Sequence, residues 1–178
     1  FENFILVDIP LLQCEKTEIW ARPVSPYASN GVGMLFLPEV DDEVVLQFIN
    51  EDPCHPVIIG SLYSRKRKTP VSLDPKNNLK TIVTKNQLKI TLDDDKKIIT
   101  IGTPGENTLI LDDDKKQILL SDANKNKVCM DKNGIMVESG KDLIFKARGN
   151  VKTEGMGIES KSKQDTKING LNIEVSAQ

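Results

Sequence analysis

The stretch Leu92-Asp93-Asp94-Asp95-Lys96-Lys97 returns almost unchanged as Leu111-Asp112-Asp113-Asp114-Lys115-Lys116, and residues 92 and 111 are 19 positions apart. Around it, three-residue apolar blocks begin at residues 90, 99, 109, 118, 128, 135 and 143, so the literal repeat spans two blocks. A period this short has room for one strand and one turn, which predicts a solenoid of short β-strands. Weaker blocks follow at Val151, Ile158, Ile168 and Ile173.

Polar segments between the blocks have the composition of tight turns. They are the Asp-rich segments 93–95 and 112–114 and the pairs Asn133-Gly134, Gly149-Asn150 and Asn169-Gly170. Asp, Asn and Gly tolerate left-handed backbone, so we expect the turns to bend at these residues. The Thr, Ile and Val residues between them suit strands.

The repeat units are too short for one chain to enclose a core. A single-chain β-helix uses about 20 residues or more for each coil, whereas these units advance by 7–10 residues. Three chains that each supply one face would close the ring around a shared apolar axis. We therefore expect an intertwined homotrimer, with main-chain hydrogen bonds that run between chains.

The first part of the chain has a different composition. Seven of the eight aromatic residues precede residue 64, and eight of the nine prolines lie at or before Pro75. Apolar runs bounded by Pro, Gly, Asn and Asp predict strands at residues 4–9, 18–22, 33–37, 43–49 and 57–62. Five short strands in about 65 residues fit a small Greek-key barrel such as an OB-fold.

The predicted fold is therefore all-β, with an N-terminal OB-fold barrel followed by an intertwined trimeric β-helix. We expect the barrel over residues 1–64, a linker over 65–78 and the trimeric needle over 79–178. The chain opens at Phe1, inside a strand-like run and without an initiator Met. We interpret it as a fragment of a longer protein.

Composition excludes several classes of protein. Charged residues make up 28% of the chain and give a net charge of −2, which does not suit a polybasic nucleic-acid binder. No apolar run approaches the roughly 18 residues of a membrane span. Cys14, Cys54 and Cys129 are odd in number and far apart, which favours reduced thiols in a protein that folds in a cytoplasm.

Candidate sites for chemistry are weak. The pair Cys54-His55 has no second histidine to complete a metal site, and we interpret it as a loop between prolines. The aspartate clusters have adjacent lysines, and the segment beginning at Asp122 departs from a calcium loop at Lys127 and Asn133. No G-x-S-x-G motif is present. We predict no catalytic, cofactor-binding or metal-ligating residues and no cofactor.

Two features raise the question of nucleic-acid binding. The run Arg65–Lys68 is basic, but it is interpreted as a solvated connector because no aromatic stacking platform accompanies it. An OB-fold can bind single strands through exposed aromatics, whereas Phe36 and Phe48 lie at predicted core positions. We therefore expect no nucleic-acid partner.

Residues 18–63 closely resemble one family. The matching residues are Trp20-Ala21-Arg22, Ser25-Pro26-Tyr27-Ala28, Gly33-Met34, Phe36-Leu37-Pro38-Glu39-Val40, Asp42-Glu43-Val44, Asp52-Pro53, Pro56-Val57 and Gly60-Ser61-Leu62-Tyr63. The order of these motifs resembles the spike family of contractile injection systems, which comprises VgrG proteins of type VI secretion, phage baseplate V proteins and T4-like tail spikes. The likeness is greatest to VgrG-like spikes of extracellular phage-tail-like particles.

The resemblance implies a structural, non-enzymatic role. The trimer would cap the inner tube and be driven through a target envelope when a sheath contracts. Its implied partners are hub and inner-tube proteins on the N-terminal side, a PAAR-type tip protein near Ser176–Gln178 and, transiently, the target membrane. It would assemble in a bacterial cytoplasm and be delivered or released as part of the particle.

The chain departs from the family in two respects. T4-like spikes insert a lysozyme between barrel and needle, for which residues 64–78 are too short. Short phage spikes bind iron at the tip through clustered histidines, whereas His55 is the one histidine of the sequence and lies in the barrel. Two alternatives stay open, namely a glycan-binding β-helical adhesin or tail-fibre segment, and an OB-fold binder of single-stranded nucleic acid.

Overall fold

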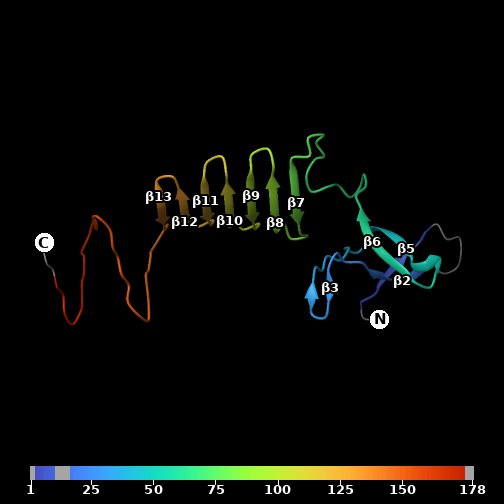
Figure 1. Cartoon of the computed structure of the whole chain (residues 1–178), viewed down its shortest axis with the longest axis horizontal. Coiled ribbons are helices and arrows are strands. Elements are labelled where there is room, and N and C mark those ends of the chain that lie inside the picture. The colour runs from blue at the N-terminus through green and yellow to red at the C-terminus, as the bar shows by residue number, and fades with distance from the viewer. Residues whose placement is uncertain (1–2, 11–16, 175–178) are drawn as a thin grey trace.

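The structure is a computed structural model that describes residues 3–10 and 17–174, and in these residues it is all-β, as predicted (Figure 1). A small β-region, an elongated sheet and a long C-terminal trace without strands follow one another along the longest axis. The single helical element of the described residues is the three-residue 3-10 turn Ile49–Glu51.

The first region contains one main sheet and a short hairpin. The sheet has the order β1-β2-β6-β5, formed by β1 (Ile5–Asp8), β2 (Glu18–Pro23), β6 (Pro56–Leu62) and β5 (Glu43–Phe48). Strands β3 (Ala28–Ser29) and β4 (Val32–Gly33) form the hairpin. Ala21, Val57 and Ile58 are buried here, so the core of this region lies between β2 and β6.

The strand predicted over residues 33–37 is wrong beyond Gly33. Residues 34–37 belong to no strand of the described residues, and their large apolar side chains are exposed. Gly33 has φ of +149°, and a Cβ at this position would lie 2.5 Å from the Tyr27 carbonyl oxygen. The hairpin therefore needs glycine at the point where the pairing ends.

The second region is a seven-stranded antiparallel meander in the order β13-β12-β11-β10-β9-β8-β7. Its strands are β7 (Leu79–Val83), β8 (Lys89–Asp93), β9 (Ile98–Gly102), β10 (Thr108–Asp112), β11 (Gln117–Ser121), β12 (Lys127–Asp131) and β13 (Gly134–Glu138). The apolar blocks that begin at 90, 99, 109, 118, 128 and 135 all lie in these strands, which confirms the repeat. The sequence pattern did not identify β7 as a repeat.

Two expectations about the needle are wrong over part of its length. Between Leu79 and Glu138 the main-chain hydrogen bonds run between successive strands of the same chain, because hairpins of five-residue strands pair locally. The apolar block at residues 143–145 forms no strand within the described part of the chain.

The 19-residue repeat appears in the backbone of the turns. Lys97 and Lys116 are left-handed, with φ of 53° and 51°, and so are Gln87, Glu106 and Lys125 on the opposite edge. The turns bend at the Asp segments, as expected, but the left-handed residue of each is the lysine that ends the turn. Their first aspartates instead accept a backbone hydrogen bond, from Lys96 N–H to Asp93 (3.0 Å) and from Lys115 N–H to Asp112 (2.9 Å).

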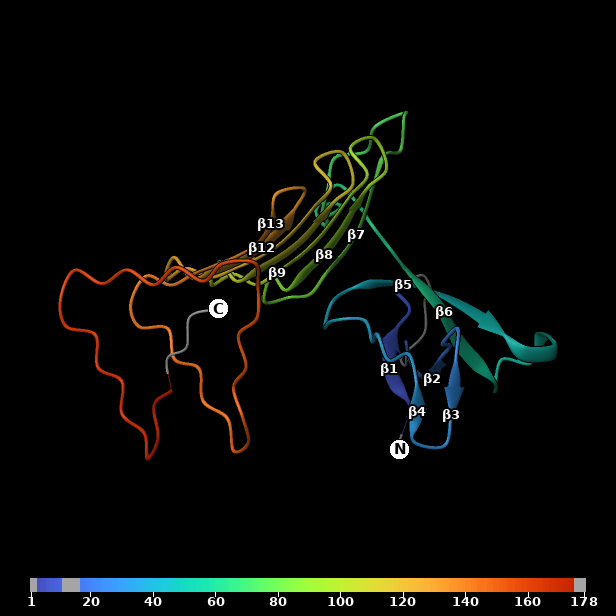
Figure 2. The same ribbon diagram turned by 60° about the vertical axis from the view of Figure 1, so that its left-hand side comes forward.

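Beyond Glu138 the backbone is extended and bends at regular intervals. Bends occur at residues 140–141, 148–149, 155–156, 163–164 and 171, and Figures 1 and 2 show the resulting zigzag. The second residue after each bend is, in order, Leu143, Val151, Ile158, Thr166 and Ile173. The second residue after a bend is therefore apolar in four of the five cases, which agrees with the periodic weaker blocks of the sequence.

Replacing Lys97 with glycine should stabilise the protein, because a left-handed conformation costs about 1 kcal/mol or more for a residue with a Cβ. We expect Lys97→Gly to raise the midpoint of thermal unfolding, measured by circular dichroism. The neighbouring Lys96→Gly variant is the control, and it should lower the midpoint because Lys96 has no positive φ to relieve. Equal effects of the two changes would contradict this description of the turn.

Candidate subunit interface

One face of the seven-stranded sheet is almost entirely apolar. The pairing register places Ile90 opposite Ile101 and Ile101 opposite Leu109, and alternate residues of each strand share a face. The residues on this face are Lys80, Ile82, Ile90, Leu92, Ile99, Ile101, Leu109, Leu111, Ile118, Leu120, Val128, Met130, Ile135 and Val137. We call this set the apolar face.

The opposite face is mixed in character. It carries charged side chains such as Asp112 and Lys127 and hydrogen-bonded hydroxyls such as those of Thr108 and Ser121, whose oxygens are 2.7 Å apart. Lys127 and Glu138, directly opposite on β12 and β13, form an ion pair of 2.7 Å. The side-chain hydrogen bond from Lys127 to Glu138 raises the pKa of Lys127. This face is therefore more polar than the apolar face, and it also carries the apolar residues Ile110, Leu119 and Cys129.

The apolar face is uncovered in the single chain. Among the described residues, no other strand stacks on it, and most of its side chains are exposed; Figure 2 shows the sheet as a single layer. The chain exposes 16645 Å², whereas a folded monomer of its mass exposes about 8,600 Å². A surface this large and apolar marks a protein–protein contact.

Lys80 is the exception on the apolar face, and its charge is held at the edge. Its ammonium group donates to the Asn77 carbonyl oxygen (2.7 Å) and pairs with the Asp94 carboxylate. A lysine can cover apolar surface with its stem while its charged group stays in water. Lys80 is therefore compatible with a contact that buries the rest of this face.

Aspartates rigidify the turns at both edges of the sheet. Asp122 Oδ1 accepts the N–H groups of Asn124 (2.8 Å) and Asn126 (3.0 Å), and its Oδ2 accepts Asn126 Nδ2 (2.8 Å). The hydrogen bonds from Asn126 lower the pKa of Asp122, and the Lys115 N–H lowers the pKa of Asp112. These carboxylates bind the chain's own N–H groups, which agrees with the interpretation of the segments as turns.

The sheet ends in a tight junction with the C-terminal trace. Asn126 Oδ1 accepts both the Ser139 hydroxyl (2.9 Å) and the Gly140 N–H (3.0 Å). A Cβ on Gly140 would lie 2.4 Å from the Asn124 carbonyl oxygen. The turn before β12 therefore fixes where the extended segment leaves the sheet.

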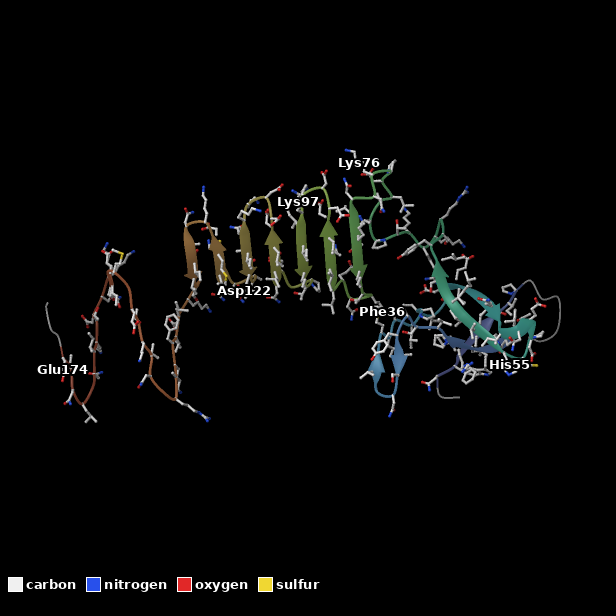
Figure 3. The ribbon with its side chains drawn as sticks, in the orientation of Figure 1. Phe36, His55, Lys76, Lys97, Asp122 and Glu174 are labelled. Atoms are coloured by element: carbon white, nitrogen blue, oxygen red, sulfur yellow. The ribbon has the colours of Figure 1, made fainter. Side chains whose placement is uncertain are left out.

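The structure places the weak chemical candidates as follows. His55 Nδ1 lies 3.0 Å from Asp52 Oδ2, and the Cys54 N–H donates to Asp52 Oδ1 (2.9 Å). The hydrogen bond from the Cys54 N–H is the main cause that lowers the pKa of Asp52, and the hydrogen bond with the His55 side chain lowers it further. Cys54 and His55 are exposed and Asp52 is half-buried, all in one short turn, which agrees with the loop interpretation. Figure 3 shows His55 far from the sheet.

Arg67 differs from its sequence interpretation as part of a solvated connector. Its guanidinium forms a half-buried ion pair of 2.8 Å with Asp42, so it ties the linker to the first region. The sequence of the basic run Arg65–Lys68 does not indicate which of its residues forms an ion pair with a distant carboxylate. In residues 3–10 and 17–174 we find no group of three His, Cys, Asp or Glu side chains placed to hold a metal, and no helix long and apolar enough to cross a membrane.

Comparison with known proteins finds family matches in both regions of the chain. Residues 4–63 match the type VI secretion system/phage-baseplate injector OB domain, and residues 98–159 match the phage baseplate V C-terminal trimerisation domain. The chain belongs to the VgrG and baseplate V spike family. Most of the apolar face, from Ile99 to Val137, lies within the matched trimerisation domain.

Curated relatives agree over the first region. Over 69 residues the chain is 33% identical to the type VI secretion system spike protein VgrG3 of Vibrio cholerae, and over 68 residues it is 32% identical to the type VI secretion system spike protein VgrG4b of Pseudomonas aeruginosa. The actin cross-linking toxin VgrG1 of Vibrio cholerae is 30% identical over 69 residues. The alignments cover 38–39% of this chain but only 6–8% of the relatives' length.

A charge on the apolar face should prevent assembly. We expect Ile101→Asp to abolish the oligomer at micromolar concentration and to lower thermal stability, because each copy loses the burial of an isoleucine, about 2 kcal/mol, and gains a desolvated carboxylate. Analytical ultracentrifugation and thermal denaturation measure the two effects.

The matched control is Thr100→Asp, one residue earlier and on the opposite face. It should leave the oligomer intact, because a carboxylate on the mixed face stays in water. An Ile101→Asp variant that assembles and melts like the unchanged chain would show that this face is not the interface.

Acid should destabilise the turns through Asp112 and Asp122. Because their folded-state pKa lies below the value near 3.8 of the unfolded chain, both carboxylates stabilise the fold above that pH. This contribution is lost as the pH falls through the folded-state pKa. The unfolding midpoint should therefore fall more between pH 6 and pH 3 in the unchanged chain than in the Asp112→Asn/Asp122→Asn variant.

The control for the acid experiment is Asp114→Asn, which removes a charge from one of the same turns. Its unfolding midpoint should fall with pH as that of the unchanged chain does. If the double variant shows the same acid dependence as well, these two carboxylates do not contribute in the way described.

Proposed function

We propose that three copies of this chain form the central spike of a contractile injection apparatus, which caps the inner tube and punctures the target envelope. The observation that carries the proposal is the uncovered apolar face, which overlaps the matched trimerisation domain. Three such faces around one axis would bury each other, and the mixed faces would then form the outer surface of the shaft.

The proposed role is mechanical and non-enzymatic. The energy for puncture comes from sheath contraction, and the spike supplies stiffness through strands paired along the shaft. We propose a barrel domain over residues 1–64, a linker over 65–78 and a trimeric needle over 79–178. That no residue is catalytic, binds a cofactor or ligates a metal stays a prediction.

The proposed partners and location follow from the spike role. Hub and inner-tube proteins would bind on the N-terminal side, and a PAAR-type tip protein would bind the C-terminal end. The target membrane would be touched transiently, and nucleic acid would not be bound. We propose assembly in a bacterial cytoplasm and delivery or release with the particle.

Sedimentation equilibrium of the purified chain tests the assembly. The expected mass is three times the 19.8 kDa of one chain. Three apolar faces around one axis bury each other, whereas the apolar face of a single chain stays exposed to water. A monomer at micromolar concentration would contradict the proposal.

A matched pair of variants in the source bacterium tests the function. Ile101→Asp in the complete spike gene should abolish release of the inner-tube protein into the medium, and Thr100→Asp should preserve it. Immunoblots of the cell fraction verify equal amounts of both variants. Normal release with Ile101→Asp would contradict the spike role.

A further inference from the structure

An exposed apolar segment precedes the turn that leads into β5. Residues 34–40, the 34–40 segment, include Leu35, Phe36 and Val40, whose exposed fractions are 78%, 66% and 88%. It belongs to no strand of the described chain. Neighbouring Leu and Phe side chains exposed to water are typical of a surface that another chain covers.

Both ends of the 34–40 segment are held in place. At its start, the Met34 N–H donates to the Tyr27 carbonyl oxygen (2.9 Å), and the Ser25 hydroxyl donates to the Met34 carbonyl oxygen (2.6 Å). At its end, Glu39 and Asp42 form a turn in which the Glu39 N–H donates to Asp42 Oδ2 (2.8 Å). The exposed side chains are therefore presented by an ordered backbone.

Two ion pairs connect this part of the chain to the linker and to the turn that follows β7. Asp42 binds Arg67 at 2.8 Å, and Glu39 binds Lys85, just beyond β7, at 3.0 Å. A hollow of about 710 Å³ lies beside them. Its lining comprises the apolar Leu35, Phe36, Leu37 and Val40, the charged Glu39, Asp42 and Arg67, and residues 82–85 at the end of β7 and in the turn after it. Figure 3 shows Phe36 on the side of the first region next to the foot of β7.

This hollow joins the apolar face. Ile82 belongs to that face and also lines the hollow beside Leu35 and Phe36. Apolar side chains of the sheet and of the first region therefore line the same hollow, beside the charged side chains that form the two ion pairs. An occupant of the trimer axis at β7 would lie next to the 34–40 segment.

We propose that a second copy of this chain covers the 34–40 segment, so that each barrel domain is locked to the neighbouring copy at the top of the needle. This inference rests on the proposed trimer. The neighbour is favoured over an unrelated protein because Ile82, which belongs to the face that three copies share, lines the same hollow as Leu35 and Phe36. Such a contact would stop the barrel from turning on its linker when force is applied along the shaft.

Photo-crosslinking from position 36 tests the inference. The photoreactive amino acid p-benzoylphenylalanine replaces Phe36 in the full chain, and trimers are formed from a mixture of nitrogen-14 and nitrogen-15 chains. After irradiation we expect a product of twice the chain mass, with crosslinked peptides that pair the two isotopes. The same amino acid at Leu73, which is 87% exposed in the linker and does not line the hollow, should give at least fivefold less product.

The outcomes separate this inference from the proposed function. A trimer by sedimentation in which position 36 crosslinks only within its own chain, or no more than position 73, would overturn the inference and leave the trimer standing. A monomer would overturn both. As a second readout, Phe36→Ser should weaken the trimer, whereas Leu73→Ser should not.

Discussion

The structure depends on burying a single-layer sheet with one apolar face. An isolated sheet of this kind forms its main-chain hydrogen bonds but leaves its apolar face in water. Burial of apolar surface is the main driving force of folding, and the isolated sheet lacks it. The few buried apolar residues of the described chain are Ala21, Val57, Ile58 and Cys129. A chain that exposes about twice the surface of a typical monomer needs further copies to reach ordinary burial.

The needle has two sections with different sources of order. Between Leu79 and Glu138 each chain satisfies its own backbone through local hairpins, and other copies are needed to cover the apolar face. Between Gly140 and Glu174 the described backbone forms no strand, so an ordered state there requires partners for the backbone as well. The Asn126–Ser139–Gly140 junction marks the change from one section to the other.

The sequence predicted the repeat well because the repeat is local. Apolar blocks separated by turns define hairpin strands, and the 19-residue spacing reappears at Lys97 and Lys116. It did not predict that these strands pair within one chain, since both arrangements have the same apolar pattern. The pairing of Arg67 with Asp42, and the exposure of Leu35 and Phe36, depend on contacts between distant segments and have no local signal.

Determination of the structure of the purified chain by cryo-electron microscopy tests the account most directly. The account predicts three sheets around a threefold axis, with Ile101 and Ile118 of each copy packed against the other copies and Thr100 and Gln117 on the outside. Density in which Thr100 and Gln117 face the axis, or in which the apolar face of a single copy meets solvent, would contradict it.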